Sequence, residues 1–328
     1  MKLNLSFNFD SGTGKKSALD QEILYDLLII GSGPAGLNAA LYGARKGLKV
    51  GVLGVKKGGQ VLDTSTVDNY IGVEDATGEG LAERFAAHVQ KLQVPILEET
   101  EVIDYFQEGK FHNVVVSTGE SYKAKTMVIA TGSKPRKLDV PGEKDYAGKG
   151  VAYCAICDGP LFKDKDVFVA GGGNSAVEAA LDLSKHARSV TLVHRSQLRA
   201  DQILINQMTA DPKITVHLKT KILEIVGDKA MTGIKVEDAD TGETKVLAGD
   251  GIFIEIGYLP NTGPFKKYVE LSESGEILTD HRKATNLPGL FAAGDVTNFP
   301  YKQIVIAASD GAVAALAAND YIHQTQFK

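Results

Sequence analysis

The sequence predicts an α/β protein made of two similar domains. This prediction rests on a pair of glycine-rich loops, GSGPAG at residues 31–36 and GGGNSA at residues 171–176, whose first glycines lie 140 positions apart. Each loop follows an apolar run typical of a strand buried on both faces and precedes a helical pattern. Strand, glycine loop, helix and second strand form a βαβ unit. We therefore expect two Rossmann-like, three-layer (ββα) nucleotide-binding domains.

The expected elements follow the same order in each half of the chain. The first half has strands at 24–30, 49–53, 102–106, 113–117 and 127–130, with a helix at 35–46. The second half has strands at 166–170, 189–193, 222–226, 233–238, 244–246 and 251–256, with a helix at 175–186. A strand at 290–293 and an alanine-rich helix from Gln303 to about Tyr321 come last.

Breaks rich in Gly and Pro at 131–135 and 256–261 are the expected linkers. They place the second domain as an insertion into the first. We expect residues 1–134 and 262–328 to form the outer domain, with an N-terminal arm at 1–21, and residues 135–261 to form the inserted domain.

Composition excludes several functional classes. The 328 residues are 43% hydrophobic and 23% charged, and the net charge of -5 is mild. Because no basic stripe is interleaved with aromatics, no nucleic-acid partner is expected. No apolar run approaches the ~20 residues that span a bilayer, so no membrane association is expected. Two cysteines and no secretory pattern indicate a cytoplasmic location.

The glycines of the first loop have physical roles. Gly31 makes the turn out of the strand, Gly33 allows a pyrophosphate to approach the backbone, and Gly36 allows the helix to pack on the sheet. The phosphates would sit at a helix N-terminus. A glycine-rich turn in another α/β protein imitates this pattern. The second strand ends in Val52-Leu53-Gly54 without the acid that holds a ribose hydroxyl.

The second loop is followed by a basic segment. His194, Arg195 and Arg199 come after its second strand, again without an acid. An arginine there pairs with a 2′-phosphate, which favours NADPH over NADH. The alternative is a solvated strand end with no ligand.

Cys154 and Cys157 form a Cys-x-x-Cys pair shortly before the second loop. This spacing brings two thiols within reach of a disulfide, and a nearby helix start would stabilise a thiolate. Zinc needs about four ligands, so no metal site is expected. The alternative is an ordinary buried pair. Asp158 is placed to protonate a leaving thiolate, although Asp before Gly-Pro is also a common turn residue.

From Tyr25 onward the chain resembles the low-molecular-weight, bacterial-type thioredoxin reductases. The resemblance rests on residues 31–36, Gly58-Gly59-Gln60, Asn69, Ala130-Thr131-Gly132, residues 154–158, residues 171–176 and Gly294-Asp295-Val296. A cysteine pair just before the second glycine loop is specific to this group. The segment Pro300-Tyr301-Lys302-Gln303-Ile304 is more similar to the flavoprotein of alkyl hydroperoxide reductase systems, whose extra N-terminal thioredoxin-like module is not expected in 328 residues.

The resemblance implies FAD in the outer domain and NADPH, with NADH possible, in the inserted domain. It implies that Cys157 is the thiol nearest the flavin and that Asp158 is the acid. It also implies a homodimer. The implied FAD contacts are Gly31, Gly33, Pro34, Ala35, Gly36, Gly59, Gln60, Asn69, Ala130, Thr131, Gly132, Gly294, Asp295, Lys302, Gln303 and Ile304. The dinucleotide contacts are Gly171, Gly173, Asn174, Ser175, His194, Arg195 and Arg199.

The function expected from these residues is reduction of thioredoxin, or of a thioredoxin- or glutaredoxin-like protein, by NAD(P)H through FAD and the Cys154–Cys157 pair. One alternative is an NADH-dependent reductase of a redoxin that feeds a peroxiredoxin. Another is a flavin-bound redox sensor without turnover.

Overall fold

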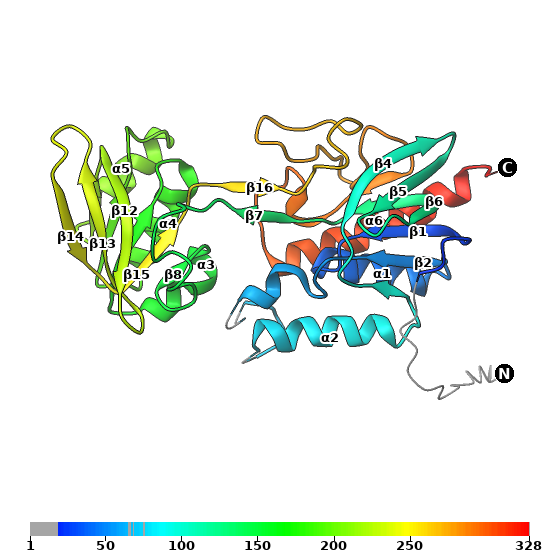
Figure 1. The fold of residues 1–328 in the computed structure, drawn as a ribbon, viewed down its shortest axis with the longest axis horizontal. Coiled ribbons are helices and arrows are strands. Elements are labelled where there is room, and N and C mark those ends of the chain that lie inside the picture. Colours follow the sequence, from blue (N-terminus) through cyan, green and yellow to red (C-terminus); the bar gives the residue numbers. More distant parts are fainter. Residues whose placement is uncertain (1–18, 65–66, 68, 75, 328) are drawn as a thin grey trace.

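The computed structural model describes residues 19–64, 67, 69–74 and 76–327. Its described part has two lobes joined by a narrow connection, as Figure 1 shows. The expected arm at 1–21 lies, apart from residues 19–21, outside the described residues. Among the described helices, none is long and apolar enough to cross a membrane.

The first lobe is built on a seven-stranded sheet in the order β3-β2-β1-β6-β5-β4, with β17 paired to β6. Its strands are β1 (Leu24–Ile30), β2 (Val50–Leu53), β3 (Ile96–Leu97), β4 (Val102–Glu108), β5 (Phe111–Val116), β6 (Ser121–Ile129) and β17 (Leu290–Ala292). Its helices are α1 (Pro34–Arg45), α2 (Gly78–Gln90) and α6 (Ile304–Gln324), with single turns η1 (Gly59–Asp63) and η3 (Gly294–Val296).

The strand β6 pairs with β1 along one edge and with β5 and β17 along the other, and it is longer than the sequence predicts. Its first part pairs antiparallel with β5, and its last part, from Met127, pairs parallel with β17. Only this last part is continuously apolar, which is why the expected strand began at residue 127.

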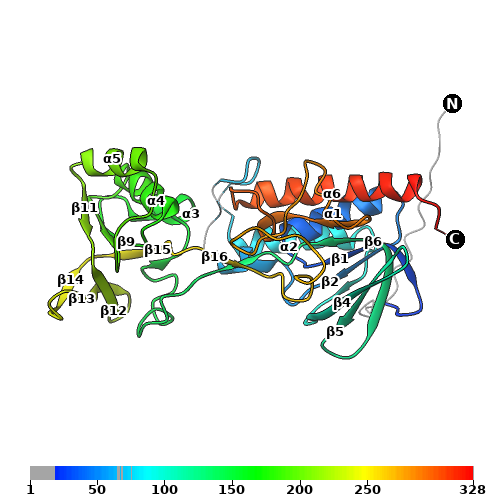
Figure 2. The same cartoon turned by 90° about the horizontal axis from the view of Figure 1, so that it is seen from above.

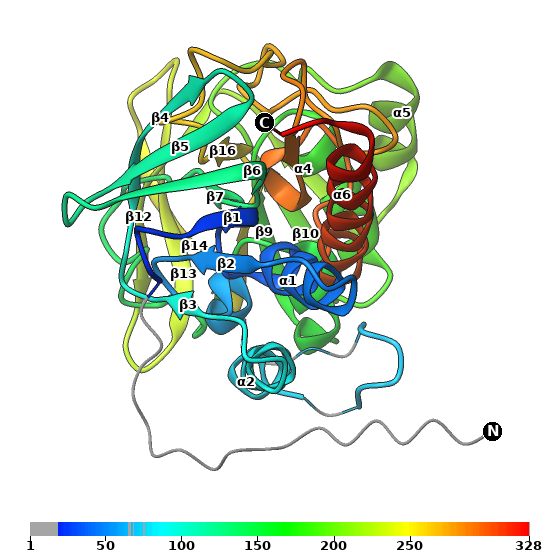
Figure 3. The same ribbon diagram turned by 90° about the vertical axis from the view of Figure 1, so that its right-hand side faces the viewer.

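The helices α1 and α6 lie side by side on one face of this sheet (Figures 1 and 3). They approach closely at Gly311, where a Cβ would collide with the Ala35 carbonyl. The alanines of α6 therefore pack against α1 as a small-residue face, and nine residues of α6 are buried. Figure 2 shows both helices above the sheet.

The second lobe contains a five-stranded sheet in the order β11-β10-β9-β15-β8 and a three-stranded antiparallel sheet, β12-β13-β14. The strands are β8 (Val151–Ala152), β9 (Asp166–Ala170), β10 (Ser189–Val193), β11 (Ile214–His217), β12 (Thr220–Gly227), β13 (Met231–Asp238), β14 (Thr244–Ala248) and β15 (Gly251–Ile254). The helices are α3 (Ala155–Asp158), α4 (Asn174–Ser184) and α5 (Gln202–Ala210), with the turn η2 (Gly159–Phe162).

The two lobes are connected by β7 (Ser133–Pro135) and β16 (Tyr258–Pro260), which pair antiparallel (Figure 1). The sequence predicted glycine- and proline-rich breaks at these positions. The connecting segments lie at these positions, and their backbone groups pair with each other and form a ribbon. Parallel sheets with helices on their faces confirm the α/β fold class.

Candidate functional site

The first glycine loop forms a tight turn with a free helix N-terminus. Gly31 has φ +117°, and a Cβ there would collide with the Ala130 carbonyl. A Cβ on Gly36 would collide with the Gly31 carbonyl, so α1 begins directly against the loop. Gly33 caps α1 without a side-chain hydrogen bond, and the first turn contains no acid. The first N–H groups of α1 therefore remain available to an anion.

The other expected contacts of the first lobe lie around this turn. A Cβ on Gly33 would stand 3.8 Å from the Gly59 Cα, so the two backbones run close together. The Gln60 amide donates to the Ser133 carbonyl at 2.5 Å, and a Cβ on Gly132 would lie 3.7 Å from its Nε2. Gln60 therefore ties the loop after β2 to the segment after β6.

Thr131 and Asn261 exchange hydrogen bonds where the connecting ribbon begins. The Thr131 hydroxyl donates to the Asn261 carbonyl at 2.7 Å, and the Asn261 amide donates to the Thr131 carbonyl at 2.9 Å. Farther along, the Asn69 amide donates to the Gln303 Oε1 at 3.2 Å. Asn69 and Gln303, 234 positions apart, are thus brought together at the start of α6.

The turn η3 packs against a buried ion pair between Asp310 and Lys283. The Gly294 N–H donates to Asp310 at 3.2 Å, and Asp310 pairs with the Lys283 ammonium at 2.6 Å. Burial raises the pKa of Asp295, with Lys302 acting against the rise. Lys302 itself donates to the Thr297 carbonyl at 2.6 Å and pairs with Glu276 at 3.0 Å. Its ammonium is thus already engaged by the protein.

The second glycine loop repeats the arrangement at the start of α4. A Cβ on Gly171 would collide with the Glu255 carbonyl and lie 2.7 Å from the Ala176 Cβ. Gly173 caps α4 without a side-chain hydrogen bond, and no atom lies within 4 Å of the position of its absent Cβ. Asn174 exchanges two hydrogen bonds with Asp201, and Ser175 is exposed. The backbone at Gly173 is therefore open to a ligand, whereas the Asn174 side chain is engaged.

The basic segment after β10 folds back on this loop. The His194 ring covers Gly172, where a Cβ would collide with it, and the Arg199 N–H donates to the Gly172 carbonyl at 2.7 Å. Burial lowers the pKa of His194, helped by Arg199 and Arg195. The Ser196 hydroxyl hydrogen-bonds His194 Nε2 at 3.1 Å. The backbone of the exposed Arg199 is thus held beside the loop, and the exposed Arg195 directly follows His194.

Cys154 and Cys157 form a disulfide with 5.3 Å between their Cα atoms. Cys154 caps α3, and its Sγ accepts a hydrogen bond from the Cys157 N–H at 3.2 Å. Burial raises the pKa of Asp158. A carboxyl that holds its proton more tightly than usual, one residue from Cys157, is suited to donate it. The expected disulfide is present, and no further cysteine remains in the chain.

Two residues that sequence reasoning missed lie next to this disulfide. Glu255 follows β15, and burial raises its pKa to about 7, with a hydrogen bond from the Ala155 N–H acting against the rise. Tyr258 donates its hydroxyl to the Tyr153 carbonyl at 3.0 Å. A signal was available for Glu255, an acid immediately after a fully buried strand, at the sheet edge where ligands of such folds bind.

The carboxylate of Glu143 forms hydrogen bonds with residues at the start of the second lobe. Glu143 is 2% exposed and accepts the Leu138 N–H at 3.2 Å, the Asp139 N–H at 2.7 Å and the Tyr153 hydroxyl at 2.8 Å. Three donors offset the cost of burying this group. Glu143 therefore fixes Tyr153, the residue before Cys154.

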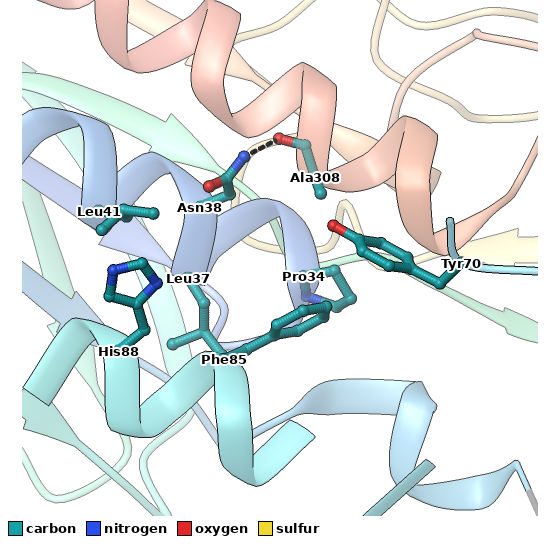
Figure 4. Close-up of a pocket in the computed structure, with 8 residues that line it drawn as sticks. All are labelled: Pro34, Leu37, Asn38, Leu41, Tyr70, Phe85, His88 and Ala308. Atoms are coloured by element: carbon teal, nitrogen blue, oxygen red, sulfur yellow. Dashed lines mark hydrogen bonds between the residues drawn. The ribbon is translucent and has the colours of Figure 1, made fainter. Parts of the chain in front are cut away.

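Figure 4 shows a small pocket between α1, α2 and the start of α6. Asn38 reaches across it to the Ala308 carbonyl at 2.6 Å, and the Tyr70 and Phe85 rings lie 5.6 Å apart. Its volume of about 50 Å³ admits water-sized molecules and no nucleotide. Within the described residues, no cluster of His, Cys, Asp and Glu suits a metal ion.

Comparison with known proteins identifies the family. The model of the pyridine nucleotide-disulphide oxidoreductase family matches residues 25–311. The chain is 46% identical over 322 residues to one subunit of alkyl hydroperoxide reductase, designated F, from Pseudomonas putida, and 44% identical over 311 residues to the same subunit from Staphylococcus aureus strain MRSA252. These matches cover 96% and 94% of this chain, but only 62% and 61% of the relatives.

Solved structures of thioredoxin reductases resemble this structure. That from Streptococcus pyogenes is 40% identical with a TM-score of 0.86, and covers 92% of this chain and 99% of its own. That from Lactococcus lactis, in its FR conformation, is 37% identical with a TM-score of 0.65, and covers 92% of this chain and 100% of its own. On these grounds the chain belongs to the pyridine nucleotide-disulphide oxidoreductase family.

Proposed function

We propose that this protein is an FAD-dependent NAD(P)H:disulfide oxidoreductase that reduces thioredoxin or a similar small dithiol protein through Cys154–Cys157. The observation that carries the proposal is the position of the disulfide, on the same lobe as the second glycine loop and capping a helix next to Asp158. A disulfide that served only stability would not need a half-buried acid, with a raised pKa, one residue away.

FAD would be held by the first lobe, whose residues fit it. The free N-terminus of α1 and the close backbones of Gly33 and Gly59 form a cradle for the pyrophosphate. The half-buried Asp295 on η3 would accept hydroxyl hydrogen bonds, and Gln303 caps α6, whose positive N-terminal end favours negative charge. When bound, the flavin supplies the transfer of a pair of electrons from nicotinamide to disulfide.

The dinucleotide would lie on the second lobe at Gly171 and Gly173, beside the start of α4. This is the point where the strand order of the sheet reverses, between β9 and β15, and ligands of open α/β sheets bind there. Arg195 and Arg199 would meet a 2′-phosphate, so we propose NADPH as the preferred donor, with measurable use of NADH.

The chemistry at the cysteines follows from their surroundings. Reduction of the disulfide consumes two electrons and two protons, and Asp158 would supply a proton to the departing Cys157 sulfur. The dithiol would then exchange with the partner's disulfide through a mixed disulfide.

A second candidate is favoured by the relatives that are named as a component of alkyl hydroperoxide reductase. Under it, the chain reduces a redoxin that feeds a peroxiredoxin, with NADH as donor. A cytoplasmic homodimer completes the proposal, and light scattering of the purified protein tests the dimer.

The deciding experiment is steady-state oxidation of NADPH and NADH with a panel of oxidised redoxins. Sustained turnover with thioredoxin supports the first candidate. Turnover only with a redoxin and peroxiredoxin supports the second. Oxidation that stops after about one equivalent with every redoxin would contradict both and support a sensor.

A further inference from the structure

The segment between β10 and α5, residues 194–201, is attached to the second glycine loop. At its start, the His194 ring lies against Gly172, where an added Cβ would stand 2.4 Å from the ring. Near its end, the Arg199 N–H donates to the Gly172 carbonyl at 2.7 Å. Between these two contacts, the half-buried Leu198 packs against the hydrophobic core of the lobe. The segment is therefore an ordered loop, which we call the basic loop.

Two reciprocal hydrogen bonds, which we call the clasp, close the far end of the basic loop. The Asn174 amide donates to Asp201 Oδ2 at 2.9 Å, and the Asp201 backbone N–H donates to Asn174 Oδ1 at 2.8 Å. Asn174 is the first residue of α4, and Asp201 directly precedes α5. The clasp therefore ties the end of the basic loop to the helix that begins at the glycine loop. Both polar atoms of the Asn174 side chain are used for this.

The basic loop carries two exposed guanidinium groups, those of Arg195 and Arg199. If the loop were free, a phosphate that bound these groups would first have to order it, and the measured dissociation constant would rise by the inverse of the closed fraction. A loop that is already closed removes this penalty. A nucleotide without the phosphate makes no use of the arginines, so its affinity does not depend on whether the loop is closed.

We propose that Asn174 and Asp201 are positioning residues for the choice of nucleotide: the clasp holds the basic loop closed, so that Arg195 and Arg199 are preorganised for a 2′-phosphate. Breaking the clasp then weakens binding of nucleotides that carry this phosphate more than binding of those that lack it. The inference rests on the proposed assignment of the two arginines to the 2′-phosphate of NADPH.

The test measures binding and needs no turnover. Titration calorimetry gives the dissociation constants of NADP⁺ and NAD⁺ for the oxidised, FAD-loaded protein, and the readout is the ratio of the two constants. A second readout uses no nucleotide. Trypsin cleaves after Arg195 and Arg199 only when the loop opens, so the rate at which mass spectrometry detects these two cuts reports how firmly the loop is held.

The variant Asp201→Ala removes the acceptor of the Asn174 amide. We expect the preference for NADP⁺ to fall about three- to tenfold, as for the loss of one hydrogen bond, and both cuts to become faster. The charge of Asp201 alone predicts the opposite sign, because removing a carboxylate favours a phosphate. Asp201→Asn keeps an acceptor and should not lower the preference. Gln202→Ala breaks an exposed bond to Asn206 on α5 and is the matched control, which should change nothing.

An exchange of the two side chains separates positioning from other effects. Asn174→Asp places two carboxylates against each other and should lower the preference for NADP⁺. In Asn174→Asp/Asp201→Asn, the new amide can donate to the new carboxylate, which still accepts the backbone N–H at position 201. The exchange should therefore restore the preference and the slow cleavage. Any effect of a charge at position 174 on the pyrophosphate acts on both nucleotides and cancels in the ratio.

An unchanged or raised preference in Asp201→Ala, or a double variant no better than Asn174→Asp alone, would overturn the proposal. If Asn174→Asp does not fold, the comparison of Asp201→Ala with Asp201→Asn decides. A lower preference in the first alone supports the proposal, and equal preferences refute it.

Failure of this inference and failure of the proposed function give different results. A wild type that prefers NADP⁺, with variants that keep the preference, would overturn the role of the clasp alone. A wild type that binds NAD⁺ as tightly as NADP⁺ would overturn the assignment of the arginines together with this inference. Variants that behave as expected, in a protein that reduces no disulfide, would overturn the proposed function alone.

Discussion

Replacing Lys283 by methionine tests how the turn beneath the proposed FAD site is held. Of the ion pairs among the described residues, Lys283–Asp310 is the most buried, with side chains 11% and 8% exposed. Asp310 also accepts the Gly294 N–H at 3.2 Å, and the Lys283 ammonium lies 5.0 Å above the Phe299 ring. Lys283→Met therefore leaves a buried carboxylate without its cation, directly under η3.

Breaking one side of a buried pair costs about 3–5 kcal/mol. For a lobe of roughly 150–250 residues, each kcal/mol lowers the melting temperature by about 2–4 °C, which gives a loss of about 6–20 °C. FAD should dissociate earlier as well, because Gly294 begins the turn that carries Asp295. The double variant Lys283→Met/Asp310→Asn removes both charges and should recover part of the loss.

The assay follows flavin fluorescence and far-UV circular dichroism during heating of the FAD-loaded protein. Arg282→Met is the matched control, since it breaks the neighbouring exposed pair with Asp320 and should cost at most about 1 kcal/mol. A Lys283→Met protein that melts like the control and keeps its FAD would refute the view that this pair supports the site.

Three further predictions concern the chemistry. Cys154→Ser and Cys157→Ser should each abolish turnover with a disulfide protein while sparing flavin reduction by NADPH; sustained thioredoxin reduction by either would exclude the mechanism. Ser196→Arg should sharpen the preference for NADPH over NADH and Arg195→Ala/Arg199→Ala should erase it, since one charge-assisted contact is worth roughly 1.5–3 kcal/mol, or about 10- to 150-fold in affinity. The measurement is kcat/KM for both nucleotides. An unchanged preference after all three substitutions would contradict the assignment of this segment to the 2′-phosphate. Because the folded pKa of Glu255, about 7, lies above its usual value, its burial becomes increasingly destabilising as pH rises toward 7; the melting temperature of Glu255→Gln relative to wild type should therefore rise between pH 5 and 8, and a flat difference would show that Glu255 is not buried as described.

The elements that the sequence predicted best are short apolar strands of the two predicted βαβ units. The strands β1, β9 and β10 have the expected bounds because each is buried on both sides and followed by a turn. Helix α2 was missed because Gly78 and Gly80 occupy its first turn, and its cap, a hydrogen bond from the Gly80 N–H to Thr77, is local and subtle. The ribbon of β7 and β16 depends on pairing between segments more than 120 positions apart.

The residues of the candidate site likewise divide into those placed by local sequence and those placed by contacts between distant segments. Loops, caps and the disulfide follow from local spacing, so Gly31, Gly173 and Cys154 stand where the sequence predicts them. The roles of these residues in binding and catalysis stay predictions. Contacts set by distant segments were not predictable: the ion pair of Lys302 with Glu276, and the hydrogen bond from Tyr258 to the carbonyl of Tyr153, the residue before Cys154. Such pairings are products of the fold.

The central claim is that electrons pass from the nicotinamide through FAD to Cys154–Cys157. An anaerobic titration with NADPH, followed by flavin absorbance and by counting free thiols, tests it most directly. The wild type should take up about two equivalents, one for the flavin and one for the disulfide, and gain two thiols, whereas Cys157→Ser should take up about one. Equal uptake by the two proteins, with no thiols gained by the wild type, would contradict the account.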